Sequence, residues 1–104
     1  MSTRKDRPQD EEIAEVRDEV TEPPDYRVLI HNDDYTTKEF VVQMLVAVFN
    51  KSAEEAAEIM WRTHQSGVGL CGIYPRDVAE TKVRVATEAA RESGFPLMLT
   101  IEEE

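Results

Sequence analysis

The chain has 104 residues, enough for one domain, and its 22 acidic against 12 basic residues give a formal net charge of −10. This acidity argues against nucleic-acid binding, which needs clustered lysines and arginines, and is more typical of solubility or of attraction to a cationic partner or ligand. A single cysteine excludes an internal disulfide, and because neither an apolar signal sequence nor a run of about 20 apolar residues is present, we expect a cytoplasmic protein.

Residues 1–24 differ in composition from the rest of the chain. They hold eight acidic and four basic residues and no aromatic residue, and they close on a pair of prolines. Such a segment buries too little apolar surface to offset its ordering entropy, so we predict a flexible, disordered N-terminal extension. Ile13, Val16 and Val20 fall at helical spacing, which leaves a partner-induced helix open as the alternative.

Residues 25–104 are predicted to form one core domain. Apolar and β-branched residues alternate over 26–31, which predicts a strand. A helix is predicted from about 37 to 49, since apolar residues recur there at helical spacing. Thr36 and Glu39 have the spacing of a capping box at the start of this helix.

A second helix and a second strand are predicted next. Ser52 and Glu55 have capping-box spacing and open a helix that runs to about Gln65, and Gly67 ends it. The segment 68–74 is apolar but contains two glycines, so we predict a kinked or bulged strand.

The remaining residues predict a third helix and a third strand. Pro75 suits the first turn of a helix that runs through Val78 and Val85 to about Ser93, and an alternating strand follows at 97–101. The order β-α-α-β-α-β is that of an α+β fold in which a three-stranded antiparallel sheet packs against three helices.

The turn between the first strand and the first helix is rich in hydrogen-bond acceptors. Asn32, Asp33 and Asp34 place one amide and two carboxylates there, an arrangement that suits an ammonium group with its three donors. The alternative is that these residues only form the turn and cap the helix. His64, at the end of the second helix, is either a further acceptor for the same cation or a histidine favoured by the helix dipole.

Other chemistries have less support. His64 has no carboxylate or thiol at ligand spacing, and His31 lies within a strand, so we expect no metal site. A small cysteine hydrolase would need Cys71 to meet His64 and an orienting aspartate. Cys71 lies in an apolar strand, where a thiol is usually inert, so we expect no catalysis and no cofactor.

A set of motifs runs through residues 23–104: Pro23-Pro24, Tyr26 through Thr36, Glu39-Phe40-Val41, Met60 with His64 four residues later, Cys71-Gly72, Val78 through Lys82, Ala90-Arg91-Glu92 and Pro96-Leu97. In this order and spacing they resemble the ClpS family, whose members recognise N-terminal degrons and hand the substrates to a Clp-type AAA+ unfoldase-protease. The resemblance implies a binding protein without catalysis, whose core domain spans 25–104. Its implied partner is the N-terminal domain of a ClpA-like or ClpC-like unfoldase.

The resemblance also implies roles for particular residues. Asn32, Asp33 and His64 would bind the α-ammonium group of a substrate. A cavity for an N-terminal Leu, Phe, Tyr or Trp side chain would be lined by Thr36, Lys38, Val41, Met60, Thr63 and Leu97. Asp77 and Lys82 would contact the unfoldase, and residues 1–24 resemble the segment that the family uses in substrate delivery.

Two residues depart from the pattern that the family resemblance implies. Lys38 stands where members often carry methionine, and Thr63 stands where they often carry valine. The Thr63 hydroxyl needs a hydrogen-bond partner. Lys38 either lays its stem over the rim of the cavity with its ammonium in water, or opposes the substrate's own charge.

The element order also resembles that of the C-terminal domain of the ribosomal stalk protein, a different class of binding module, which docks translation factors. That domain has no need of an Asn-Asp-Asp turn facing a histidine at a helix end, and it usually presents lysine on its recognition helix. We therefore keep it as the second interpretation.

Overall fold

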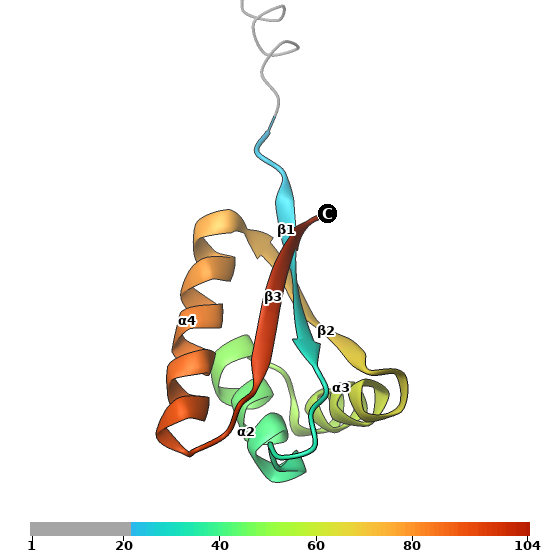
Figure 1. Cartoon of the computed structure of the whole chain (residues 1–104). Coiled ribbons are helices and arrows are strands. Elements are labelled where there is room, and N and C mark those ends of the chain that lie inside the picture. Colours follow the sequence, from blue (N-terminus) through green and yellow to red (C-terminus); the bar gives the residue numbers. More distant parts are fainter. Residues whose placement is uncertain (1–21) are drawn as a thin grey trace, which may run out of the picture.

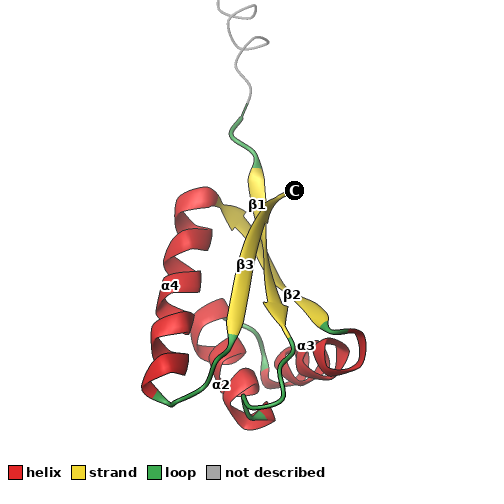
Figure 2. Ribbon diagram, in the orientation of Figure 1, coloured by secondary structure: helices red, strands yellow, loops and turns green. Residues whose placement is uncertain are grey.

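In the part of the chain that the structure describes, three strands and three helices follow one another in the predicted order (Figures 1 and 2). They are β1 (Asp25–His31), α2 (Lys38–Phe49), α3 (Ala53–Ser66), β2 (Val68–Pro75), α4 (Arg76–Glu92) and β3 (Met98–Glu103). The computed structural model describes residues 22–104, so most of the predicted N-terminal extension, including Ile13, Val16 and Val20, lies outside the described residues. The predicted α+β class and element order are confirmed.

The three strands form one antiparallel sheet in the order β2-β1-β3, so β1 is the central strand. Val28 and Ile30 point to the same face of the sheet and are fully buried, because successive side chains of a strand alternate between its two faces. On β3 their partners are Ile101 and Leu99. The helices cover this apolar face.

The predicted irregularity of the second strand is a β-bulge. Val28 pairs with Gly72 and Leu29 with Leu70, which leaves Cys71 as an extra residue on β2. Gly72, next to the bulge, leaves room for the ring of Tyr74, which a Cβ atom at this position would displace. The predicted bulge is therefore confirmed.

The helix α4 approaches the sheet closely because its buried face is made of alanines. Ala79, Ala86 and Ala90 are fully buried. Val78 and Val85 lie on the other side of the helix and are 37% and 41% exposed. Small side chains at a contact shorten the distance between packed elements, so α4 lies flat against the core.

The helix ends correct one prediction and confirm another. The N-cap of α2 is Thr37, whose hydroxyl accepts a bond from the backbone N–H of Phe40, so the predicted capping box at Thr36 is wrong. The hydroxyl of Thr36 is instead engaged by the preceding turn. In α3 both bonds of the predicted capping box between Ser52 and Glu55 are present, each 3.0 Å long.

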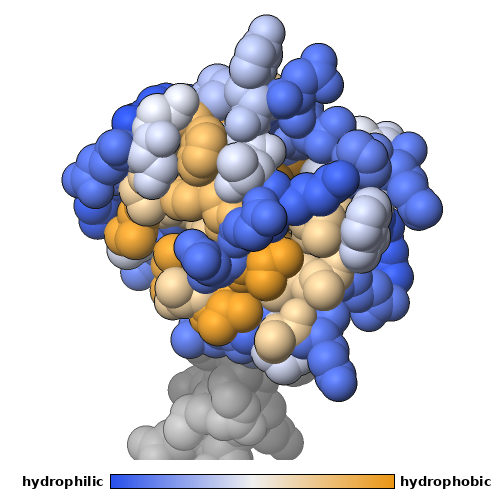
Figure 3. Space-filling view, turned by 90° about the horizontal axis from the view of Figure 1, so that it is seen from below, coloured by the Kyte–Doolittle hydropathy of each residue, from blue (hydrophilic) through white to orange (hydrophobic). Residues whose placement is uncertain are grey.

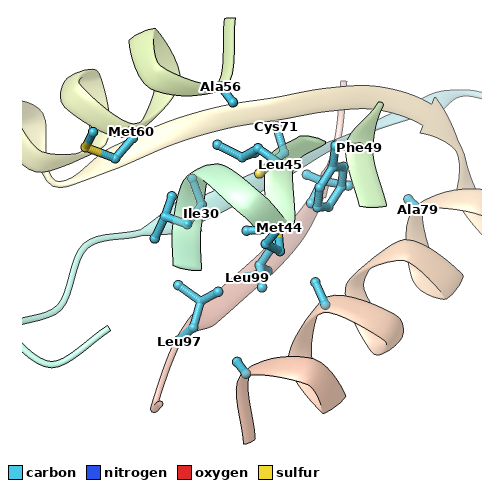
Figure 4. Close-up of a cluster of buried hydrophobic side chains, with 14 residues drawn as sticks. Ile30, Met44, Leu45, Phe49, Ala56, Met60, Cys71, Ala79, Leu97 and Leu99 are labelled. Carbon is cyan, nitrogen blue, oxygen red and sulfur yellow. The ribbon is translucent and has the colours of Figure 1, made fainter. Parts of the chain in front are cut away.

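The hydrophobic core runs between the sheet and the helices (Figure 4). Ile30, Met60 and Leu97 lie at one end of this cluster, and Phe49 lies toward the other. The edge-on ring pair of Phe40 and Phe95, with centroids 5.2 Å apart, joins α2 to the segment before β3. Apolar side chains from the sheet and from the helices therefore reach the end of the molecule at which β1 ends.

Candidate functional site

A cavity of about 440 Å³ opens where β1 ends and α2 begins. Seen from below, the molecule presents hydrophobic side chains bordered by hydrophilic ones (Figure 3). The cavity is lined by Ile30, His31, Asn32, Asp33, Asp34, Tyr35, Thr36, Thr37, Lys38, Glu39, Val41, Met60, Thr63, His64 and Leu97. All nine residues predicted to bind a substrate's ammonium group or side chain are in this lining, although they come from three separate stretches of the chain.

The inner part of the cavity is apolar. Ile30 comes from the central strand, Val41 from α2, Met60 from α3 and Leu97 from the segment before β3. All four side chains are buried. They belong to the hydrophobic core, so the cavity is an opening of the core onto the surface and suits an apolar group.

Thr63 satisfies its hydroxyl within its own helix. The side chain is buried, and its hydroxyl donates a 2.8 Å bond to the backbone carbonyl of Ile59. Space for this hydroxyl comes from Gly69 on β2, where a Cβ atom would collide with Thr63 Oγ1. The substitution of threonine for valine therefore leaves no unpaired hydroxyl in the wall of the cavity.

Asp33 organises the acceptor-rich turn. Its Oδ1 accepts bonds from the backbone N–H groups of Tyr35, at 2.8 Å, and Thr36, at 2.7 Å. Its Oδ2 accepts a 2.8 Å bond from the Thr36 hydroxyl. The turn-forming alternative for Asp33 is thus observed, but a carboxylate has about four acceptor sites, so three bonds leave room for a further donor.

The protein environment also keeps Asp33 ionised. Partial burial alone would raise the pKa of its carboxyl group, but the bonds from the Thr36 and Tyr35 N–H groups and the Thr36 hydroxyl, with the nearby charge of Arg91, outweigh burial. The pKa of Asp33 is therefore lowered. A negative charge stands at the mouth of the cavity throughout the neutral range.

His64 lies in the last turn of α3 and borders the same cavity as Asn32 and Asp33. Within residues 22–104, neither ring nitrogen of His64 has a hydrogen-bond partner, so a neutral imidazole can offer one of them to a ligand. His31 also borders the cavity, but its Nε2 lies 2.7 Å from the hydroxyl of Thr100 and is already engaged.

The Lys38 side chain borders the cavity, and its ammonium group lies 4.9 Å from the ring centroid of Trp61, on α3. Trp61 is half-exposed and does not line the cavity. The two predicted arrangements of Lys38 toward a substrate both stay predictions. Sequence reasoning missed Trp61, although its spacing of three residues from His64 places both on one face of α3.

The two residues predicted to contact an unfoldase lie elsewhere, on α4. Asp77 is exposed in the first turn of the helix. Lys82 does more than occupy a solvated face: its Nζ donates bonds of 2.6 Å to the Val48 carbonyl and 3.2 Å to Asn50 Oδ1, at the end of α2. Neither residue borders the cavity.

Cys71 does not have the properties of a nucleophile. It is fully buried, and burial raises the pKa of its thiol to about 12, so no thiolate forms at neutral pH. Residues 22–104 also contain no cluster of three or more His, Cys, Asp or Glu side chains able to hold a metal ion. Among the helices of this part of the chain, none has the length and apolarity that a membrane span requires.

Known proteins resemble the chain closely. Residues 21–100 match the family model described as ATP-dependent Clp protease adaptor protein ClpS. The ATP-dependent Clp protease adapter protein ClpS of Desulforapulum autotrophicum is 60% identical over 82 residues, 79% of each chain, and that of Oleidesulfovibrio alaskensis is 46% identical over 103 residues, 99% of each. The structure of Agrobacterium tumefaciens ClpS2 bound to L-phenylalaninamide, 43% identical, superposes with a TM-score of 0.77 over 80% of this chain and 100% of that one.

These matches overturn the interpretation as a ribosomal stalk domain, because they cover the cavity, the acceptor-rich turn and the sheet together. The relatives carry the name of an adapter, which agrees with the predicted absence of catalysis. The chain belongs to the ClpS family.

Proposed function

We propose that the protein is an adaptor that binds substrates through an exposed, bulky hydrophobic N-terminal residue and delivers them to a Clp-type AAA+ unfoldase-protease. The main support is one juxtaposition: an ionised carboxylate, an amide and an imidazole border a cavity whose inner wall is apolar. A free chain start is the part of a polypeptide that carries an ammonium group and a side chain on the same carbon. It therefore matches both halves of the site.

The ammonium-binding half of the site favours an unblocked N-terminus. Asp33 accepts a charge-assisted hydrogen bond, Asn32 offers an amide oxygen, and neutral His64 offers a ring nitrogen. An acetylated N-terminus lacks the charge and most of the donors. Each acceptor that a bound peptide covers without pairing would then cost about 1–3 kcal/mol.

The apolar half of the site selects the side chain. Burying a Leu or Phe side chain against Val41, Met60 and Leu97 is worth about 1.5–3 kcal/mol relative to leaving it in water. The L-phenylalaninamide bound by A. tumefaciens ClpS2 has a free amino group and a benzyl side chain, the two features that our proposal requires of a ligand. We extend the proposed range to N-terminal Leu, Phe, Tyr and Trp.

The unfoldase is proposed to dock elsewhere on the domain. Asp77 and Lys82 lie on α4, outside the cavity lining, so a substrate and the N-terminal domain of a ClpA-like or ClpC-like unfoldase can be bound together. Residues 1–24 would assist delivery. Because the protease partner is ATP-dependent, we place this activity in the cytoplasm.

A peptide panel tests the proposal. Fluorescent peptides that begin with Phe, acetyl-Phe or Gly, and are otherwise identical, are titrated with the protein and followed by anisotropy. We expect binding of the Phe peptide alone, since acetylation removes the charge and glycine has no side chain to bury. Equal affinity for the Phe and acetyl-Phe peptides would refute the proposed ammonium site.

A further inference from the structure

Trp61 contacts two residues that line the cavity, Lys38 and His64, although it does not line the cavity itself. Lys38 is the first residue of α2, whereas Trp61 and His64 belong to α3. The Lys38 ammonium lies 4.9 Å from the centroid of the Trp61 ring, and the Trp61 ring meets the His64 imidazole edge-on at 5.9 Å. Trp61 is therefore the link between the two helices at the mouth.

The charge of Lys38 is poorly placed without this link. The first turn of a helix carries partial positive charge on its free N–H groups, so a lysine there is disfavoured. Within residues 22–104, no carboxylate forms a salt bridge with Lys38. Its long stem borders the cavity, so a released ammonium could swing toward the place where a substrate's own ammonium binds.

We propose that Trp61 is a specificity-determining residue of this chain. It holds the Lys38 ammonium at the rim and fixes the orientation of the His64 ring, so that the cavity can accept the positively charged N-terminus of a substrate. The inference rests on the proposed function, because it assumes that the ligand brings an ammonium group. Trp61 acts through Lys38 and His64 and is a positioning residue. It explains how the site tolerates a lysine at its edge.

The first experiment measures the contact without any ligand. The chain contains one tryptophan, so its intrinsic fluorescence reports on Trp61 alone. Replacing Lys38 with methionine removes the cation from the ring face, and we expect a changed emission spectrum. Arg62→Ala is the matched control, because Arg62 neighbours Trp61 on α3 but pairs with Glu58, at 3.1 Å. An unchanged spectrum in Lys38→Met would overturn the proposal, whatever peptide the protein binds.

The second experiment is a double-mutant cycle on the affinity for the Phe peptide, with Trp61→Ala, Lys38→Met and both together. An exposed cation–π contact corresponds to about a two- to fivefold change in affinity, so we expect Trp61→Ala to weaken binding by about that factor. Trp61→Phe, which keeps a ring, should bind nearly as well as the wild type. The loss in Trp61→Ala should shrink in the Lys38→Met background.

The salt dependence of peptide affinity distinguishes this role of Trp61 from a purely structural one, which would not depend on salt. Repulsion between a released Lys38 and the substrate ammonium is screened as salt rises from about 0.1 to about 1 M, so the deficit of Trp61→Ala should narrow. The inference would be overturned if Trp61→Ala bound the Phe peptide with wild-type affinity. It would also be overturned if Trp61→Ala lost the same affinity in the wild-type and in the Lys38→Met background. Failure of the wild-type protein to bind the Phe peptide would instead count against the proposed function, and the fluorescence experiment would still decide the contact.

Discussion

At the scale of single residues, Asp33 has two tasks that a mutation must separate. Its Oδ1 holds the turn through the backbone N–H groups of Tyr35 and Thr36, while its charge is proposed to receive the ligand. Alanine would remove both the turn bonds and the charge. Asparagine keeps an oxygen for the two backbone bonds and removes the charge, although its amide nitrogen replaces Oδ2 and cannot accept the bond from the Thr36 hydroxyl. It disturbs the turn less than alanine does, so it is the sharper substitution.

We therefore predict that Asp33→Asn abolishes binding of the Phe peptide while the domain stays folded. The charge-assisted bond is lost and an amide N–H₂ group faces the incoming ammonium, which together cost about 2–4 kcal/mol, or roughly 30- to 1,000-fold in affinity. The measurement is peptide anisotropy with circular dichroism as a check on folding. Asp77→Asn removes the same charge from α4 and should leave peptide binding unchanged; retained binding in Asp33→Asn would contradict the role.

A second prediction concerns the acid stability of the fold. Because the pKa of Asp33 is lowered in the folded protein, its ionised form contributes stability that is fully present above the unfolded value of about 4 and is lost as the pH falls through the lowered folded value. Asp33→Asn has no such proton to take up. Between about pH 5 and 2 its thermal midpoint should fall less steeply than that of the wild type. If the thermal midpoints of the two proteins fell equally steeply with pH, the ionised form of Asp33 would contribute nothing to stability through the turn.

The lining residues differ in how well the sequence predicts them. Asn32, Asp33, Thr36 and Lys38 are close together in the sequence, and the family resemblance groups them with His64. The contact between Lys38 and Trp61 has no such signal, because it joins two helices whose relative placement depends on packing. The hydrogen bonds of Lys82 were not predicted for the same reason, because its partners Val48 and Asn50 are 34 and 32 residues away along the chain.

At the scale of secondary-structure elements, the cavity wall depends on how closely α3 approaches β2. Gly69 leaves room for the Thr63 hydroxyl at this contact. We predict that Gly69→Ala destabilises the protein by about 1–3 kcal/mol, because the added Cβ forces Thr63 away from β2. Urea unfolding of Gly69→Ala, Thr63→Ala and the double variant measures this cost. The loss should be partly rescued in the double variant, and strictly additive losses would show that the two residues do not compete for space.

The junction of α4 with α2 gives a prediction for Lys82. Removing its ammonium leaves the Val48 carbonyl without a charged donor, so Lys82→Ala should lower the free energy of unfolding by about 1.5–3 kcal/mol. Arg84→Ala, on an exposed position of the same helix, should change it by less than about 0.5 kcal/mol. Urea unfolding distinguishes the two, and a loss for Lys82→Ala no larger than that for Arg84→Ala would contradict the structural role.

This result bears on any test of unfoldase docking. A weakened complex with Lys82→Ala would combine lost contact with a loosened helix junction. Asp77→Asn is the cleaner variant, because within residues 22–104 the Asp77 side chain accepts only the N–H of its neighbour Val78. Its stability should remain that of the wild type while unfoldase binding falls.

Boundaries were harder to predict than elements. Ser52 and Glu55 form their capping box because one residue of each type stands at the required spacing. Before α2 two threonines are adjacent, and the spacing rule favoured Thr36 because Glu39 follows it by three residues. The structure uses Thr37 instead, since the Asp33 turn has already engaged the hydroxyl of Thr36. The spacing rule for capping boxes therefore failed where another local hydrogen bond engaged the same hydroxyl.

At the scale of the whole molecule, the fold class and the order of the elements follow from patterns in the sequence. Alternating apolar residues mark the first and third strands, an apolar run with two glycines marks the second, and helical spacing marks the three helices. The position of β1 in the middle of the sheet is a further consequence of tertiary packing. It could not be read from β1 itself, whose pattern fits an edge strand equally well.

The central position of β1 affects how the site binds a ligand. The acceptor turn begins at the last residue of a strand held on both sides, and three bonds to Asp33 complete it before any peptide arrives. Such a preorganised receptor loses little conformational entropy on association. Variants of this site should therefore differ mainly in how long a peptide resides, with encounter rates almost unchanged.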